Sequence, residues 1–298
     1  MSFATGLKTI IVATGLDGRS DGALEYARKL AAAYNARIVL AHGVDPVDYA
    51  SVASVPGKVL SGLTDQTRAV LDEMAADLIR EGIHSHSEIR QGEVAQMLVD
   101  VAEQYRAELI VIGTEGRQGA GPVLVGSIAE QLVRLAKCAV MAVAADYNAG
   151  AYRPVPGGPV MLAIERNEAT EAAAETACSL AETFHRTLIV VHARRPAEAI
   201  AFLNPVAGNM KEFGMKESRF PVRCIVKDGK PGDAIAEAIA QYQPSILVIG
   251  VKRTSETSGP HGTAFSILAR SRVPVLCVPP PPKKPELEPE ACAHVPAV

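Results

Sequence analysis

The chain carries the same series of apolar segments twice, in the same order. Residues 11–14 correspond to 161–164, and residues 38–42 correspond to 188–192. The later matches are 92–98 with 229–235, 109–113 with 246–250, and 139–143 with 274–278. The offset between the copies decreases along the chain, so the second copy is shorter than the first. The residues that it lacks fall in loops and in one middle helix. The period far exceeds the roughly 20–50 residues of a solenoid repeat, which indicates a duplicated domain.

The length of 298 residues suits two domains of ordinary size, each with enough chain to bury a core. We expect a first domain over 1–146, a linker over 147–158 and a second domain over 159–280. The linker is predicted from its Asn, Gly and Pro content. Residues 281–298 are rich in proline and poor in apolar residues, which predicts an extended or disordered tail.

Short apolar strands alternate with amphipathic helices in each half. One helical stripe follows the spacing i, i+3, i+4, i+7 closely: Val94, Met97, Leu98, Val101, Ala102 and Tyr105. The expected strands of the first half are 8–14, 37–44, 84–91, 108–113 and 139–144. Near-continuous apolar strands that alternate with helices predict an α/β fold, with a mostly parallel sheet covered on both faces.

A glycine-rich motif follows the fourth expected strand. Gly113 and Gly116 come first, and Gly126-Ser127 then stands where the next helix begins. A helix N-terminus holds anions through unpaired N–H groups and the helix dipole. Glycine lets phosphate oxygens approach the backbone, and the hydroxyl of Ser127 adds a donor. The motif predicts a nucleotide phosphate site, although spacing alone supports an ordinary glycine-rich turn equally well.

Composition narrows the classes of partner. The net charge is -3 and no basic run stands out, which argues against nucleic acid. No apolar run approaches the length of a membrane span, and residues 1–6 lack the features of a signal peptide. The five cysteines are scattered, and three lie in apolar settings typical of small core residues. We therefore expect a soluble protein in the reducing cytoplasm, with no membrane partner.

Taken together, these motifs resemble the universal stress protein (UspA-like) family, over nearly the whole chain and in tandem form. The matching features are the strand 11–14, the helix start at Ser20, Gly92 before the third helix, and the glycine motif behind strand 109–113. The resemblance implies Rossmann-like domains of the adenine nucleotide alpha hydrolase-like type. Each would hold a five-stranded parallel sheet of order 3-2-1-4-5. It also implies ATP binding in many members, and regulatory roles in the stress response rather than catalysis.

The resemblance assigns the nucleotide contacts residue by residue. The expected ATP-binding residues are Ala13, Thr14, Gly15, Gly43, Gly113, Gly116, Arg117, Gly126, Ser127 and Ile128. ATP is the expected ligand, with or without Mg²⁺, and we predict neither catalytic residues nor a dedicated metal site. The resemblance also implies pairing of domains through their last strands, here 139–144 and 273–278, and allows a homodimer of tandem chains. The protein partner is not identified.

The first half departs from the family pattern at two positions. Gly15 stands where the family has an Asp near the adenosine, and Asp17 follows two residues later. Gly43 replaces a Val whose backbone meets the adenine. A backbone contact survives a change of side chain, whereas one lost hydrogen bond costs about 1 kcal/mol. We expect these departures to weaken ATP binding without abolishing it.

The second half keeps the family's carboxylate but departs from the family pattern in the glycine motif. Glu165 retains a carboxylate at the family's Asp position, but Arg253 replaces the second glycine and Gly262-Thr263 arrives one residue early. We therefore expect ATP in the first domain, and either nothing or a different ligand in the second. Glu165, Arg166 and Glu168 favour a solvated turn over a small-ligand or metal site.

Two alternatives to an ATP-binding regulatory protein stay open. One is an interaction scaffold that has lost nucleotide binding, which the residues at positions 15 and 253 would explain. The other is a slow ATP-hydrolysing or adenylating enzyme, which needs a general base beside the γ-phosphate. Arg117 and Ser127 lie near the predicted phosphates, but the sequence offers no convincing base, so we favour binding over catalysis. His42 and His192 end matching strands, and we expect them to have structural roles.

Overall fold

The computed structural model describes residues 6–16, 18, 20–44, 57–114, 126–144, 157–165, 167–193, 220–252 and 263–281, with the backbone alone for 57–64. The greater part of the predicted linker (147–156) and of the predicted tail (282–298) lies outside these residues. Gly116, Arg117, Asp17 and Arg253 lie outside them as well.

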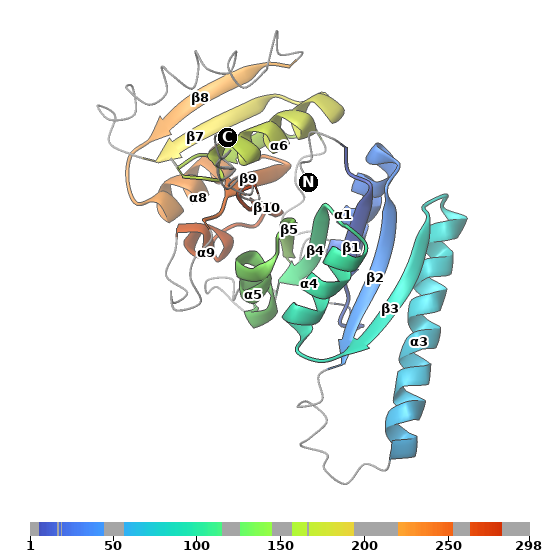
Figure 1. Cartoon of the computed structure of the whole chain (residues 1–298). Coiled ribbons are helices and arrows are strands. Elements are labelled where there is room, and N and C mark those ends of the chain that lie inside the picture. The colour runs from blue at the N-terminus through green and yellow to red at the C-terminus, as the bar shows by residue number, and fades with distance from the viewer. Residues whose placement is uncertain are drawn as a thin grey trace, which may run out of the picture.

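The first half alternates strands with helices as predicted (Figure 1). Its elements are β1 (Thr9–Ala13), α1 (Asp21–Tyr34), β2 (Arg37–Val44), α3 (Gly57–Arg80), β3 (Ser85–Gln91), α4 (Val94–Gln104), β4 (Leu109–Thr114), α5 (Ser127–Leu135) and β5 (Ala139–Ala144). Each strand begins and ends within one residue of its predicted bounds.

The second half repeats the series in shorter form. Its elements are β6 (Val160–Ala163), α6 (Thr170–Thr183), β7 (Leu188–Ala193), β8 (Val222–Lys227), α8 (Pro231–Tyr242), β9 (Ile246–Gly250), α9 (Thr263–Leu268) and β10 (Val275–Val278). The internal repeat in the sequence is therefore a repeat of the fold.

The strands form one sheet of order β3-β2-β1-β4-β5-β10-β9-β6-β7-β8. Within each half the strands are parallel and follow the predicted order 3-2-1-4-5. The halves join where β5 and β10 pair antiparallel, with Met141 opposite Leu276. The predicted pairing of the last two strands is thus confirmed within one chain.

Side chains alternate between the two faces of the sheet, as the strand period requires. Ile10 and Val12 point into a core shared with α1, α3 and α6, whereas Ile11 points into a core shared with α4, α5, α8 and α9. Each core contains residues from both halves, so the packing is continuous across the β5–β10 junction. Within the described part of the chain, every helix is too short or too polar to cross a bilayer.

The described cysteines fit the expectation of core residues, with one exception. Cys277 on β10 is buried, and burial raises the pKa of its thiol to about 12. Burial also raises the pKa of Cys138 and of Cys178 to about 12. Cys224 on β8 is exposed, and its smaller upward pKa shift also comes from desolvation. The three thiols with the largest shifts are therefore weak nucleophiles at neutral pH.

A buried carboxylate ties the start of β1 to the start of β4. Glu108 is 6% exposed, and its Oε2 accepts hydrogen bonds from the backbone N–H groups of Lys8 (3.1 Å) and Thr9 (2.9 Å). The corresponding residue of the second half is Ser245, and its hydroxyl donates a hydrogen bond to the Pro159 carbonyl at 3.3 Å. At this position of the described strands, a carboxylate that accepts two backbone hydrogen bonds therefore occurs in the first half and a serine hydroxyl in the second.

We expect Glu108→Ala to destabilise the first half by about 2 kcal/mol, because it leaves buried N–H donors without an acceptor. Urea unfolding measures the change. Glu108→Gln keeps an acceptor oxygen at the same reach and is expected to lose much less stability. Equal midpoints for both variants would show that the two hydrogen bonds contribute little.

Candidate functional site

Those predicted contact residues of the first half that the structure describes lie at the carboxyl ends of its strands and at the start of α5. Ala13 ends β1 and pairs with Ala41 on β2 and with Ile112 on β4, so Gly15 and Gly113 continue from neighbouring strands. β1 lies between β2 and β4, where the strand order reverses direction. Open α/β sheets bind ligands in the crevice at this point.

Helix α5 begins beside this edge and packs against β4 and β5. Gly126 is its N-cap residue, with φ −59° and ψ 147°, and no side chain among the described residues caps the helix. Ser127 is exposed and Ile128 is half-buried in the first turn. The first backbone N–H groups of α5 are therefore available to an anion at the sheet edge.

Thr14 has a structural role in the turn after β1. It is buried, its hydroxyl lies 3.1 Å from that of Ser20, and it accepts a hydrogen bond from the Leu16 N–H at 3.3 Å. Leu16 adopts φ 59° and Gly18 adopts φ 80°. A left-handed conformation is costly for a residue such as leucine, so the Thr14–Ser20 contact stabilises a tight turn in which Gly15 and Gly18 are exposed.

Two histidines hold matching strand ends together. The Nδ1–H of His42 donates to the Thr14 carbonyl at 2.7 Å, and the Nδ1–H of His192 donates to the Ile164 carbonyl at 2.9 Å. A carbonyl only accepts, so Nδ1 carries the proton in both rings. This repeated contact bears out the expected structural role.

Gly43 is constrained by packing from helix α4. A Cβ added at Gly43 would lie 2.8 Å from Met97 Cε and 3.0 Å from Val94 Cγ2. The two side chains already fill the space above the end of β2. A larger residue at position 43 would therefore require Met97 and Val94 to shift, a packing reason for glycine that the family resemblance did not supply.

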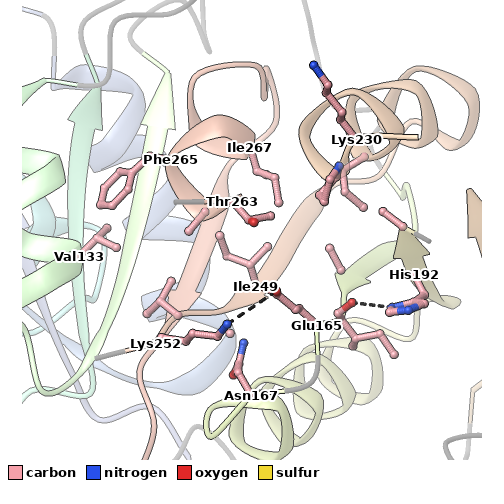
Figure 2. Close-up of a pocket in the computed structure, with 18 of the residues that line it drawn as sticks. Val133, Glu165, Asn167, His192, Lys230, Ile249, Lys252, Thr263, Phe265 and Ile267 are labelled. Atoms are coloured by element: carbon pink, nitrogen blue, oxygen red, sulfur yellow. Dashed lines mark hydrogen bonds and ion pairs between the residues drawn. The ribbon is translucent and has the colours of Figure 1, made fainter. Parts of the chain in front are cut away.

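A cavity of about 900 Å³ opens at the corresponding edge of the second half. Its floor is formed by the strand ends at Ala163, Ile164 and Ile249, and helices α8 and α9 line its sides (Figure 2). Val133 and Arg134 of α5 complete the lining from the first half. The cavity is thus bounded by both halves of the chain.

Polar groups are spaced around the rim of this cavity. Lys252 forms an ion pair with Glu165 at 3.7 Å, and Figure 2 shows the two side chains meeting beside Asn167. The Oδ1 atom of Asn167 accepts from the Ala169 N–H at 2.8 Å, which holds its side chain in place before α6. Asp228 and Lys230 also line the cavity, and Figure 2 shows Lys230 at the start of α8, apart from the Lys252–Glu165 pair.

The sequence placed Glu165 in a solvated turn, and the structure refines that interpretation. Glu165 is exposed, as expected, but it also lines the cavity. Across the described residues, no cluster of three or more His, Cys, Asp or Glu side chains is arranged to hold a metal ion. The cavity itself was not predicted from the sequence.

Comparison with known proteins gives one consistent result. The profile of the universal stress protein family matches residues 6–144 and again residues 158–279. A universal stress protein of Mycolicibacterium smegmatis is 27% identical over 295 residues, which cover 91% of this chain and 97% of that protein. A universal stress protein of Mycobacterium tuberculosis is 28% identical over 290 residues, covering 89% of this chain and 95% of its own length.

The fold has a solved counterpart of the same tandem length. A universal stress protein from Archaeoglobus fulgidus superposes with a TM-score of 0.75 at 18% identity, covering 91% of this chain and 98% of that one. At this level of identity the similarity concerns the fold alone.

Proposed function

This chain belongs to the universal stress protein family, and we propose that it is a regulatory protein that binds ATP in its first half. Occupancy of that site would shift the equilibrium between free protein and a complex with a protein partner. The proposal includes a cytoplasmic setting and leaves room for a homodimer of tandem chains. Mg²⁺ would accompany the phosphates without a dedicated site of its own.

One observation carries the proposal. In the first half, the uncapped N-terminus of α5, with Gly126 and Ser127, begins beside the ends of β1 and β4, where the strand order reverses. Backbone N–H groups and a serine hydroxyl are the donors that phosphate oxygens accept from. When bound, ATP would supply the triphosphate charge, and the chain's residues would only hold and orient it. A regulatory role is favoured because the carboxylate in the first turn of α5, that of Glu130, is paired with Arg134 at 2.9 Å.

The serine gives a direct test with a matched control. Ser127→Ala removes one donor to a phosphate oxygen, so we expect the affinity for ATP to fall about fivefold, or about 1 kcal/mol. Titration calorimetry on the full chain measures affinity and stoichiometry together. Thr263→Ala removes the corresponding hydroxyl in the second half and is expected to leave ATP binding unchanged.

The stoichiometry tests the assignment to one half. We expect one ATP per chain in the wild type and in both variants. Sensitivity to Thr263→Ala together with indifference to Ser127→Ala would move the nucleotide to the second half. Steady turnover of ATP to ADP by the wild type would favour the enzyme alternative.

A further inference from the structure

The cavity of the second half has a chemistry different from that of a nucleotide site. We propose that it binds an amphipathic organic anion, with an apolar body on the strand ends and an anionic head near Lys230. This inference is independent of ATP binding in the first half, because it rests on a separate cavity and on other residues.

The helix beside this strand end carries a smaller residue in the second half than in the first. Gly43 pairs with Arg90, and Ala193 pairs with Lys227, so the sheet register aligns helix α4 with helix α8. In this alignment Met97 of the first half corresponds to Ala234 of the second. Met97 Cε lies 2.8 Å from the position of a Cβ added at Gly43, whereas Ala234 is buried, and α8 lines the cavity with Pro231 and Ile235.

The inner lining is predominantly apolar. Its floor and sides come from Ala163, Ile164, Ile235, Ile249, Val251 and Ile267. On the side toward the first half, Phe265 and Val133 close the wall, and Phe265 is held by the Arg134 guanidinium 5.1 Å above its ring. Arg134 is itself paired with Glu130 at 2.9 Å. A ribose or triphosphate would lose hydration against such a lining, whereas an aliphatic or aromatic body gains from burial.

The charge at the helix start is reversed between the halves. Glu93 caps α4, and its carboxylate accepts from the N–H groups of Ala95 (3.2 Å) and Gln96 (2.8 Å). At the corresponding N-cap of α8 stands Lys230, and no described side chain caps the helix. The first half therefore holds its own anion at this point, and the second half has a cation there instead. A ligand's anionic head would interact favourably with the positive end of the α8 dipole and with the ammonium group of Lys230.

Other charged side chains line the cavity together with Lys230. Lys252 is already paired with Glu165 at 3.7 Å, and Asp228 is exposed two residues before Lys230. Arg134 is paired with Glu130 and Lys252 with Glu165, so Lys230 is the lysine of the described lining that remains to pair with a ligand's anionic head. The volume of about 900 Å³ lies within the range of roughly 300–1,000 Å³ usual for small-molecule sites. An organic monoanion thus matches the cavity in charge and in size.

Two fluorescent probes with the same aromatic body distinguish the contribution of the anionic group to binding from that of apolar contact. We expect 1-anilinonaphthalene-8-sulfonate to saturate at one molecule per full chain. Its uncharged counterpart, N-phenyl-1-naphthylamine, should bind the same cavity about tenfold more weakly, because it lacks the head that pairs with Lys230. Saturating ATP should leave both titrations unchanged.

Two variants test the two parts of the proposal. Lys230→Glu installs the residue that caps the first half, so it should weaken the sulfonate about tenfold or more and leave the uncharged probe nearly unaffected. Ala163→Met extends into the cavity from its floor and should weaken both probes. Ile79→Met, at a position on α3 that is 57% exposed, serves as the control and should change neither probe titration.

Several outcomes would overturn the proposal. Equal affinity for both probes, with no effect of Lys230→Glu, would show that no anion is recognised. Binding of the sulfonate that never saturates, or that ignores both Lys230→Glu and Ala163→Met, would place it elsewhere on the chain. Displacement of the sulfonate by ATP, one for one, would make the cavity a nucleotide site.

Discussion

Gly126→Val is expected to lower the affinity for ATP about a hundredfold, or about 2.7 kcal/mol. Gly126 is the N-cap of α5, at φ −59° and ψ 147°, which is a conformation that valine adopts readily. The branched side chain would therefore leave the backbone intact and occupy the space that phosphate oxygens need. Titration calorimetry measures the change in affinity, and circular dichroism checks that the fold is kept.

The repeat supplies the control for this variant. Gly262→Val makes the same substitution at the corresponding position of the second half, where we expect no effect on ATP. Gly126→Ala should fall between wild type and Gly126→Val, because a single methyl obstructs less. Wild-type affinity in Gly126→Val would remove the phosphate site from the start of α5.

Leu276→Ala is expected to lower the free energy of unfolding by about 3 kcal/mol, since truncating a fully buried leucine leaves a cavity. Leu276 lies on β10 opposite Met141 of β5, and both side chains are 0% exposed. The substitution therefore weakens the junction that joins the two halves of the sheet. Urea unfolding followed by circular dichroism measures the loss.

Two further variants show whether the loss is specific to this junction. Leu276→Met conserves volume and should cost less than about 1.5 kcal/mol. Ile79→Ala truncates an apolar side chain on α3 that is 57% exposed, so we expect a change within about 0.5 kcal/mol. An effect of Leu276→Ala no larger than that of Ile79→Ala would contradict the continuous core across β5 and β10.

The central strands could be predicted from the sequence because they are short apolar runs, whereas β3 (Ser85–Gln91) and β8 (Val222–Lys227) are more polar and only partly buried. Segments such as 109–113 and 246–250 are buried on both faces of the sheet, and such strands can be identified from their own apolar composition. The strand order and the β5–β10 pairing came instead from the family resemblance, because apolar patterning does not say which strands lie side by side. Both expectations are confirmed.

The differences between the halves could not be predicted from either half alone. Met97 and Ala234 are both ordinary apolar helix residues, and the sheet register shows that they occupy corresponding positions in the two halves. Glu93 and Lys230 both precede a helix, and their opposite effects depend on which backbone N–H groups lie within reach. Glu108 precedes an apolar strand, and its hydrogen bonds depend on the backbone of Lys8 and Thr9 at the start of β1.

The assignment of ATP to the first half is tested most directly by what the purified protein carries. The protein is denatured, and any released nucleotide is identified by chromatography and quantified against the chain. We predict ATP at about one molecule per chain, and its loss from Gly126→Val but not from Gly262→Val. Absence of released nucleotide together with failure to bind added ATP would contradict the account, and the protein would then be an interaction scaffold.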